Sequence, residues 1–226
     1  TDLIPKGHIV AYEQFSLPVT KPALTIQPNG QVNLDLKSRE ATISGTNFKI
    51  QFDLVKGKIS HLNYLGKEML ADGKGPEPDF WRAPTDNDFG NGLDQRCKIW
   101  RKAGAERQLI DKKAITISGN EAEVRMTFSL PGLKGETVAT YESVYRIYGD
   151  GSISVKNSIS PGVDNLPELP RMGMQLQLGR EFENLAWYGR GPMESYWDRK
   201  TSMLIGNYAG KVKDQYFPYV RPQENG

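Results

Sequence analysis

The densest group of side chains suited to chemistry lies in residues 79–92. Asp86, Asn87 and Asp88 carry carboxylate and amide oxygens, which hydrogen-bond to sugar hydroxyls and coordinate hard cations. Flat aromatic faces that suit a pyranose ring accompany them at Phe80, Trp81 and Phe89. Gly90 gives the stretch backbone freedom. The same residues also fit a capped turn in front of a helix, so residue types alone leave a binding loop and a structural turn both open.

A second aromatic and charged group spans residues 187–199, around a Gly-x-Gly-Pro turn. Arg199 can pair with Asp198 or Glu194 to hold a long loop onto a sheet, which is the structural interpretation. The functional interpretation of the same residues is a surface that contacts a sugar. The residues that we assign to sugar contact or structure across both groups are Trp81, Arg82, Arg190, Glu194 and Trp197. A third run of similar character, residues 214–226, ends the sequence.

Several catalytic chemistries find no support in the sequence. The two histidines, His8 and His61, are far apart, and neither has a nucleophile beside it. Asp86-x-Asp88 resembles the start of a calcium loop, but no acidic residue closes it at the twelfth position. The single Cys97 excludes an internal disulfide or a multi-cysteine metal site, so we predict no metal. Acidic residues are plentiful, but no spacing singles out the carboxylate pair of a glycosidase.

The composition narrows the class of protein. Among the 226 residues, 29 basic and 27 acidic side chains leave a net charge of +2, which argues against a nucleic-acid or anionic-membrane surface. No apolar run approaches the roughly 18 residues of a membrane span. The 23 glycines and 14 prolines exclude a long helical bundle. The sequence leaves the compartment open between cytoplasm and periplasm.

Short stretches of alternating apolar and polar residues dominate the chain and predict antiparallel β-sheets packed as a sandwich. The predicted strands cover residues 41–45, 48–54, 58–62, 115–117, 124–128, 138–148, 153–157, 172–178 and 185–188. Gly149-Asp150-Gly151 predicts a hairpin turn, because Gly and Asp tolerate positive φ. One short amphipathic helix is predicted over Leu93–Gly104.

The first forty residues differ from the rest. The pattern of residues 8–15 predicts a strand. The polar stretch after it contains several prolines, which indicates an extended linker. We therefore predict three parts: residues 1–17 as the last strand of a preceding domain, 18–40 as a linker, and 41–226 as a large β domain.

Three motifs in order resemble the C-terminal domain of large family-2 glycoside hydrolases of the β-galactosidase type. They lie at residues 80–88 (FWRAPTDND), 187–199 (WYGRGPMESYWDR) and 219–226 (YVRPQENG). The resemblance covers about residues 40–226. Residues 4–15 are similar to the last strand of the immunoglobulin-like domain that precedes it in that family.

The resemblance implies an antiparallel β-supersandwich of the galactose-mutarotase-like kind, incomplete at its C-terminal end. It places the family's catalytic Glu residues in a barrel upstream of Thr1, so it implies no catalytic residue and an inactive fragment. It also implies that the loop beginning at Asp86-Asn87-Asp88-Phe89-Gly90 borders the active-site entrance, with Gly90 as a hinge.

The function that the resemblance implies is that of a supporting domain in a retaining β-galactosidase. The implied partners are a β-galactoside substrate, other domains of the same chain and further copies of the enzyme, without nucleic acid or membrane. The implied cofactors are Mg and Na, bound in other domains. The rival hypothesis is an independent carbohydrate-binding module. An aldose epimerase, suggested by the fold alone, lacks the paired histidines that such chemistry usually uses.

Overall fold

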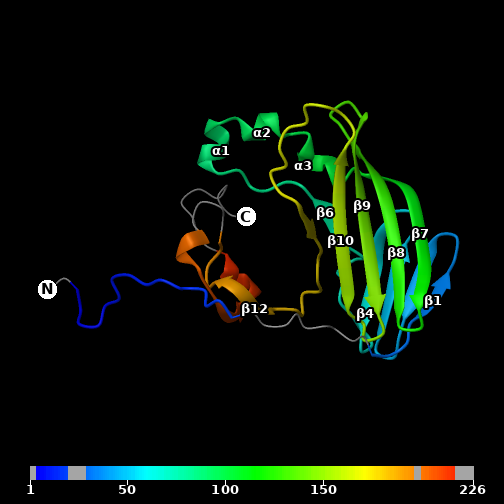
Figure 1. The fold of residues 1–226 in the computed structure, drawn as a ribbon, viewed down its shortest axis with the longest axis horizontal. Coiled ribbons are helices and arrows are strands. Elements are labelled where there is room, and N and C mark those ends of the chain that lie inside the picture. The colour runs from blue at the N-terminus through cyan, green and yellow to red at the C-terminus, as the bar shows by residue number, and fades with distance from the viewer. Residues whose placement is uncertain (1–3, 20–28, 196–199, 217–226) are drawn as a thin grey trace. The chain divides into compact units, whose positions relative to one another are not determined.

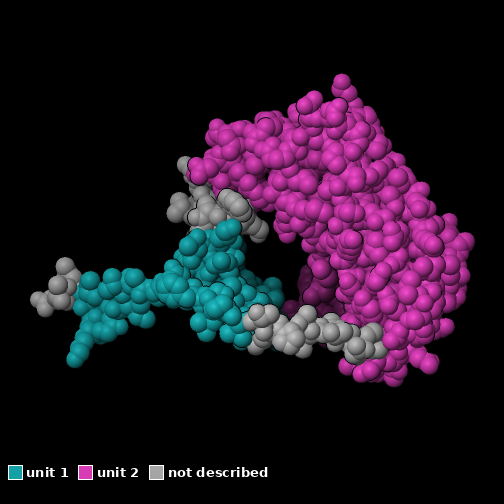
Figure 2. Space-filling view, in the orientation of Figure 1, with its two compact units in different colours: residues 1–26, 183–218 teal, residues 27–182, 219–226 magenta. Residues whose placement is uncertain are grey.

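The computed structural model describes residues 4–19, 29–195 and 200–216 (Figure 1). The chain divides into two compact units, coloured separately in Figure 2. Unit 1 contains residues 1–26 and 183–218, and unit 2 contains residues 27–182 and 219–226. No helix of the described residues is long and apolar enough to cross a membrane.

The first sheet of unit 2 is a five-stranded antiparallel meander in the order β1-β2-β3-β4-β5. Its strands are β1 (Asn33–Leu36), β2 (Glu40–Ser44), β3 (Phe48–Asp53), β4 (Lys58–Tyr64) and β5 (Lys67–Glu68). Buried residues alternate with exposed or half-buried ones along β3, as its apolar–polar pattern predicts. Gly57 takes a φ of +66° in the turn between β3 and β4, a conformation that favours glycine.

The second sheet of unit 2 has the order β10-β9-β8-β7. It consists of β7 (Gln108–Ser118), β8 (Glu121–Pro131), β9 (Thr137–Tyr148) and β10 (Ile153–Pro161). All of its neighbours are antiparallel, and the turn between β9 and β10 lies at Gly149-Asp150-Gly151, as predicted. Gly151 adopts a φ of +86°, and the Asp150 side chain accepts a hydrogen bond from Ser152 N at 2.9 Å.

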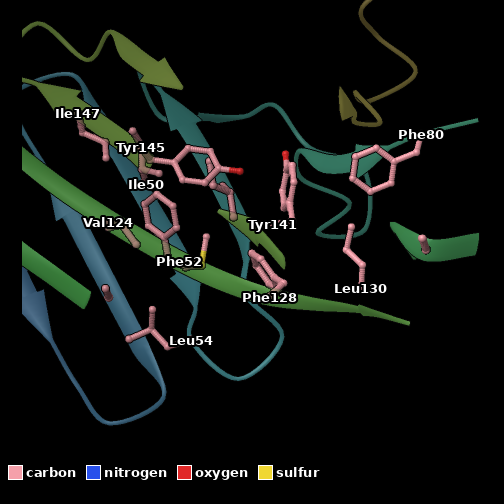
Figure 3. Close-up of a cluster of buried hydrophobic side chains, with 14 of the residues drawn as sticks. Ile50, Phe52, Leu54, Phe80, Val124, Phe128, Leu130, Tyr141, Tyr145 and Ile147 are labelled. Carbon is pink, nitrogen blue, oxygen red and sulfur yellow. The ribbon is translucent and has the colours of Figure 1, made fainter. Parts of the chain in front are cut away.

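The two sheets pack face to face and bury an aromatic core (Figure 3). Phe52 of β3 meets Tyr145 of β9 edge to face, with ring centroids 5.4 Å apart. Phe128 and Tyr141 extend the cluster along the second sheet, with centroids 6.2 Å apart. The predicted all-β antiparallel sandwich is therefore confirmed.

A smaller antiparallel pair lies beside the sandwich. It joins β6 (Glu77–Asp79) to β11 (Gly173–Gln175). The strand predicted over residues 172–178 is shorter than expected, although Leu178 still forms an isolated bridge with Leu70.

The sequence predicted one short helix, but the structure has more than one. The described residues contain three short α-helices: α1 (Asp86–Gly90), α2 (Leu93–Arg96) and α3 (Trp100–Ala103). The single helix predicted over residues 93–104 breaks at Cys97, whose φ of −98° and ψ of 6° end α2. Leu93, Cys97 and Trp100 are nevertheless all buried, so the apolar spacing located the inward face but not the break.

Unit 1 is built on a hairpin of β12 (Asn184–Gly191) and β13 (Leu204–Lys211), with 3₁₀ turns at η1 (Lys200–Ser202) and η2 (Val212–Gln215). Residues 8–15, predicted as a strand, carry no strand assignment. The Gln14 side-chain amide instead exchanges two 2.8 Å hydrogen bonds with the backbone of Ile205. β1 lies within the stretch predicted as a linker, and the three-part domain division stays a prediction.

The aromatic core generates a stability prediction. Phe52→Ala should lower the free energy of unfolding of unit 2 by about 3–5 kcal/mol, because a fully buried ring leaves a cavity. Urea denaturation followed by circular dichroism measures the change. The matched control is Phe89→Ala, which removes a ring that is 46% exposed and should cost less than about 1 kcal/mol. Equal costs for the two variants would contradict this account of the core.

Candidate functional site

The first predicted group lies in what we term the helical corner, residues 79–104, which carries α1, α2 and α3 (Figure 1). Phe80 anchors the corner to the sandwich. Its buried ring lies edge to face against Tyr141 at 5.6 Å and against Trp100 at 6.1 Å. Phe80 therefore serves the core and is not available as a sugar platform.

Arg82 and Asp88 form a two-pronged ion pair at the centre of the helical corner. One terminal nitrogen of Arg82 donates to Asp88 Oδ1 at 2.8 Å, and the other donates to Oδ2. Asp88 Oδ2 also accepts from the backbone N–H of Thr85 at 2.8 Å, and Thr85 Oγ1 accepts from Asp88 N at 3.3 Å. These last two bonds make a capping box at the start of α1.

This arrangement sets the charge state of Asp88. The hydrogen bonds from Arg82 lower the pKa of the carboxyl group, and they outweigh burial, which acts in the opposite direction. Asp88 is only 7% exposed, so its carboxylate is held as a buried anion. A carboxylate committed in this way is a poor proton donor and has little capacity left for a metal or a sugar.

A second segment, residues 167–171, holds the helical corner in place, and we term it the clamp. Trp100 Nε1 donates to Pro167 O at 3.0 Å, and Arg82 Nε donates to Pro170 O at 3.2 Å. Arg96 of α2 pairs with Glu168 at 2.6 Å. Arg171 lies 3.5 Å from the Asp79 carboxylate. The helical corner is thus fixed from both sides, by the core below and the clamp beside it.

The solvent face of α1 presents the remaining residues of the predicted loop. Asp86, Asn87, Phe89 and Gly90 are exposed. A Cβ at Gly90 would meet nothing within 4 Å, so the backbone there is uncrowded. Trp81 is half-buried, and the Arg101 guanidinium lies over its ring at 5.7 Å. The capping box at the start of α1 matches the capped turn that the residue types left open beside a binding loop, and Asp88 holds Arg82 to this turn.

The second predicted group lies in unit 1 and is largely structural. The Arg190 guanidinium donates to the carbonyl oxygens of Lys200 and Met203 at 3.0 and 2.9 Å, closing the long loop between β12 and β13. Trp187 Nε1 donates to Arg190 O at 2.9 Å, and its ring lies 5.4 Å from that of Tyr208. Glu194 is half-buried at the start of the loop. Trp197 lies outside the described residues, as does the third run from residue 217.

Sequence reasoning missed the groups that hold the helical corner. The role of Thr85 as a helix cap could have been predicted, because Thr85-x-x-Asp88 is a capping-box spacing. The clamp had no local signal, since its carbonyl oxygens lie about 70 to 90 residues from their donors. Among the residues that the structure describes, no group of three or more His, Cys, Asp or Glu side chains could hold a metal ion.

Comparison with known proteins assigns most of the chain to one family. A family model described as beta galactosidase small chain matches residues 44–226. A beta-galactosidase of Priestia megaterium is 40% identical over 97% of this chain, and one of Lactobacillus delbrueckii subsp. bulgaricus is 38% identical over 88%. A beta-galactosidase of Streptococcus thermophilus is 32% identical over the whole chain. The chain spans about a fifth of the length of each relative.

The buried ion pair generates a pH-dependent prediction. Asp88→Asn should lower the free energy of unfolding by about 3 kcal/mol at pH 7, because it leaves Arg82 without its carboxylate. The folded-state pKa of Asp88 lies below its ordinary value of 3.8. The contribution of the pair is therefore complete above that value and is lost as the pH falls through the folded-state pKa. Denaturation curves measured from pH 7 down to pH 2.5 should show the difference between the two proteins shrinking as the pH falls below 3.8.

The matched control is Asp72→Asn, the same chemical change at an exposed position. Asp72 has a φ of +52°, which Asn tolerates well. We expect a change within about 0.5 kcal/mol at every pH. A cost for Asp88→Asn no larger than that of the control would show that the ion pair does not hold the corner.

Proposed function

Because the chain belongs to the beta-galactosidase small-chain family, we propose that it is the supporting, non-catalytic part of an enzyme that hydrolyses terminal β-D-galactosides with retention. The observation that carries the proposal is the similarity over nearly the whole chain to proteins named beta-galactosidase, of which it spans about a fifth. The catalytic carboxylates, on this proposal, belong to another part of the enzyme.

The charge states of the described carboxyl groups support a non-catalytic role. A glycosidase needs one carboxylic acid with a raised pKa as proton donor. Several carboxyl groups that the structure describes instead have pKa values below their usual range, because hydrogen bonds or nearby cations outweigh any cost of burial. They are those of Asp53, Glu68, Glu77, Asp88, Asp150 and Glu168.

We further propose that the exposed face of α1 borders the active-site entrance of the complete enzyme. Asp86, Asn87 and Phe89 offer two polar side chains and one ring to solvent, and Arg82 and the clamp fix the base on which they stand. A fixed base limits the entropy lost when such groups contact a sugar. Gly90, next to them, is the residue at which α1 can move.

The proposal also concerns the partners and ions of the complete enzyme. The other domains of the same chain are the direct partners of this part, and further copies assemble with it as a homo-oligomer. Mg and Na act in those other domains. The second candidate function is an independent carbohydrate-binding module, and the exposed Tyr188 and Phe89 rings are the features that favour it.

The purified 226-residue chain should not turn over a chromogenic β-galactoside. It should also give no saturable change in tryptophan fluorescence with galactose or lactose at millimolar concentrations, because a supporting part presents only one side of a sugar pocket. Colorimetric assay and fluorescence titration measure the two quantities. Measurable turnover would refute the non-catalytic role, and saturable binding would favour the carbohydrate-binding module.

A variant of the complete enzyme tests the placement of α1. Phe89→Ala should raise KM for a galactoside by about tenfold, the loss expected when one aromatic contact is removed. The stability of the enzyme should hardly change, because the ring is exposed. Steady-state kinetics and thermal denaturation measure the two effects.

The control for this variant is Ile117→Ala, which removes a side chain of similar exposure (47%) on β7. Its KM should match that of the unmodified enzyme. Unchanged kinetics for Phe89→Ala would place α1 away from the substrate, while leaving the family assignment intact.

A further inference from the structure

A pocket lies in unit 2 between the turn that joins β3 to β4 and the start of β7. It contains no residue of α1. Its volume is about 430 Å³. We term it the basic pocket; it is lined by Val55, Lys56, Lys58, Glu77, Ala105, Arg107, Gln108 and Leu109. None of these residues takes part in the function proposed above.

Positive charge is concentrated in the basic pocket, whereas the chain as a whole is nearly neutral. Three cationic side chains and one carboxylate line it, which leaves a net charge of +2. The whole chain carries the same net charge over 226 residues. Positive charge that is gathered in a concave site raises the local concentration of small anions.

Arg107 is the buried component of this charge. Its side chain is only 5% exposed, and its guanidinium lies 5.0 Å from the centroid of the Phe128 ring. One terminal nitrogen donates to Gly104 O at 2.8 Å and to Glu77 Oε2 at 3.2 Å, and the other donates to Gly57 O at 3.5 Å. The Nε–H has no hydrogen-bond partner among the described residues. Because this nitrogen has less than 1 Å² of exposed surface, Arg107 contributes a buried positive charge to the pocket and not a free donor.

Glu77 holds the cations together. Lys58 Nζ donates to Glu77 Oε1 at 3.1 Å, so the carboxylate lies between Lys58 and Arg107. Burial opposes ionisation of Glu77, but the hydrogen bonds and charges of these two partners outweigh it and lower its pKa. An ammonium group has three donors, and the bond to Glu77 uses one of those on Lys58. Lys56, which is exposed, adds a charge at the rim.

We propose that the basic pocket binds a small oxyanion, the phosphate or carboxylate group of a small molecule. Glu77 fixes Lys58 and Arg107 in advance, so little side-chain entropy is lost when the anion arrives. The two fixed cations and Lys56 outnumber the one carboxylate, which leaves charge for the ligand. The volume exceeds what a single phosphate fills, so the site accommodates a substituent on the anion.

The probes are inorganic phosphate and acetate, titrated into the 226-residue chain at constant ionic strength in chloride. Isothermal titration calorimetry measures the affinity, and circular dichroism checks the fold of each variant. The test variant is Lys56→Ala, because it removes a rim charge and leaves the Glu77 ion pairs intact. Its affinity should fall by about threefold to fivefold, the value of one partly exposed ionic contact. Lys58→Met should lower the affinity further.

The matched control is Lys49→Ala, which removes an exposed lysine of β3 that does not line the pocket. Its affinity should equal that of the unmodified chain. Saturable binding of either anion, weakened by Lys56→Ala and not by Lys49→Ala, supports the proposal, and the better ligand identifies phosphate or carboxylate as the preferred class. No saturable binding of either anion, or equal losses in the two lysine variants, overturns it.

Discussion

The helical corner depends on one constraint, the burial of the Asp88 charge. An ionised carboxylate away from water must keep its partners, and here these are Arg82 and the capping box of Thr85. Arg82 in turn bonds to Pro170, so the same charge ties α1 to the clamp. The exposed residues of α1 therefore stand on a base that cannot rearrange without exposing or unpairing the charge.

The sandwich was predictable because its sequence pattern is repeated and local. The inward residues of β3 and β9, such as Phe52 and Tyr145, recur at every second position, and a shift of one residue would turn them all to solvent. The turn at Gly149–Gly151 was readable for the same reason, since positive φ has a residue signature. Alternation locates strands but does not specify partners. The pairing of β6 with β11, about 95 residues apart, therefore had no signal.

The candidate site was predictable in location but not in the roles of its residues. Asp86, Asn87 and Asp88 are chemically similar in sequence, yet only Asp88 is buried, and its carboxylate serves the fold. What distinguishes it is Arg82, six residues earlier, together with a clamp that only the tertiary structure brings near. The prediction of a single helix over residues 93–104 was wrong for a related reason. Helices of four residues have little intrinsic stability, so contacts such as that of Trp100 with Pro167 decide where they begin and end.

Two of the arginine–carboxylate pairs of unit 2, at the helical corner and at the basic pocket, differ in how their charges are balanced. At the helical corner all three nitrogens of the Arg82 guanidinium have partners, and Asp88 accepts from both prongs, so the site is closed. At the basic pocket Glu77 is shared between Lys58 and Arg107, and Arg107 Nε is left without a partner among the described residues. A carboxylate bound by one cation leaves no net charge, whereas two cations that share one carboxylate leave positive charge beside a cavity. The ratio of cations to carboxylates therefore separates the closed Arg82–Asp88 pair from the pocket at which we propose that an anion binds.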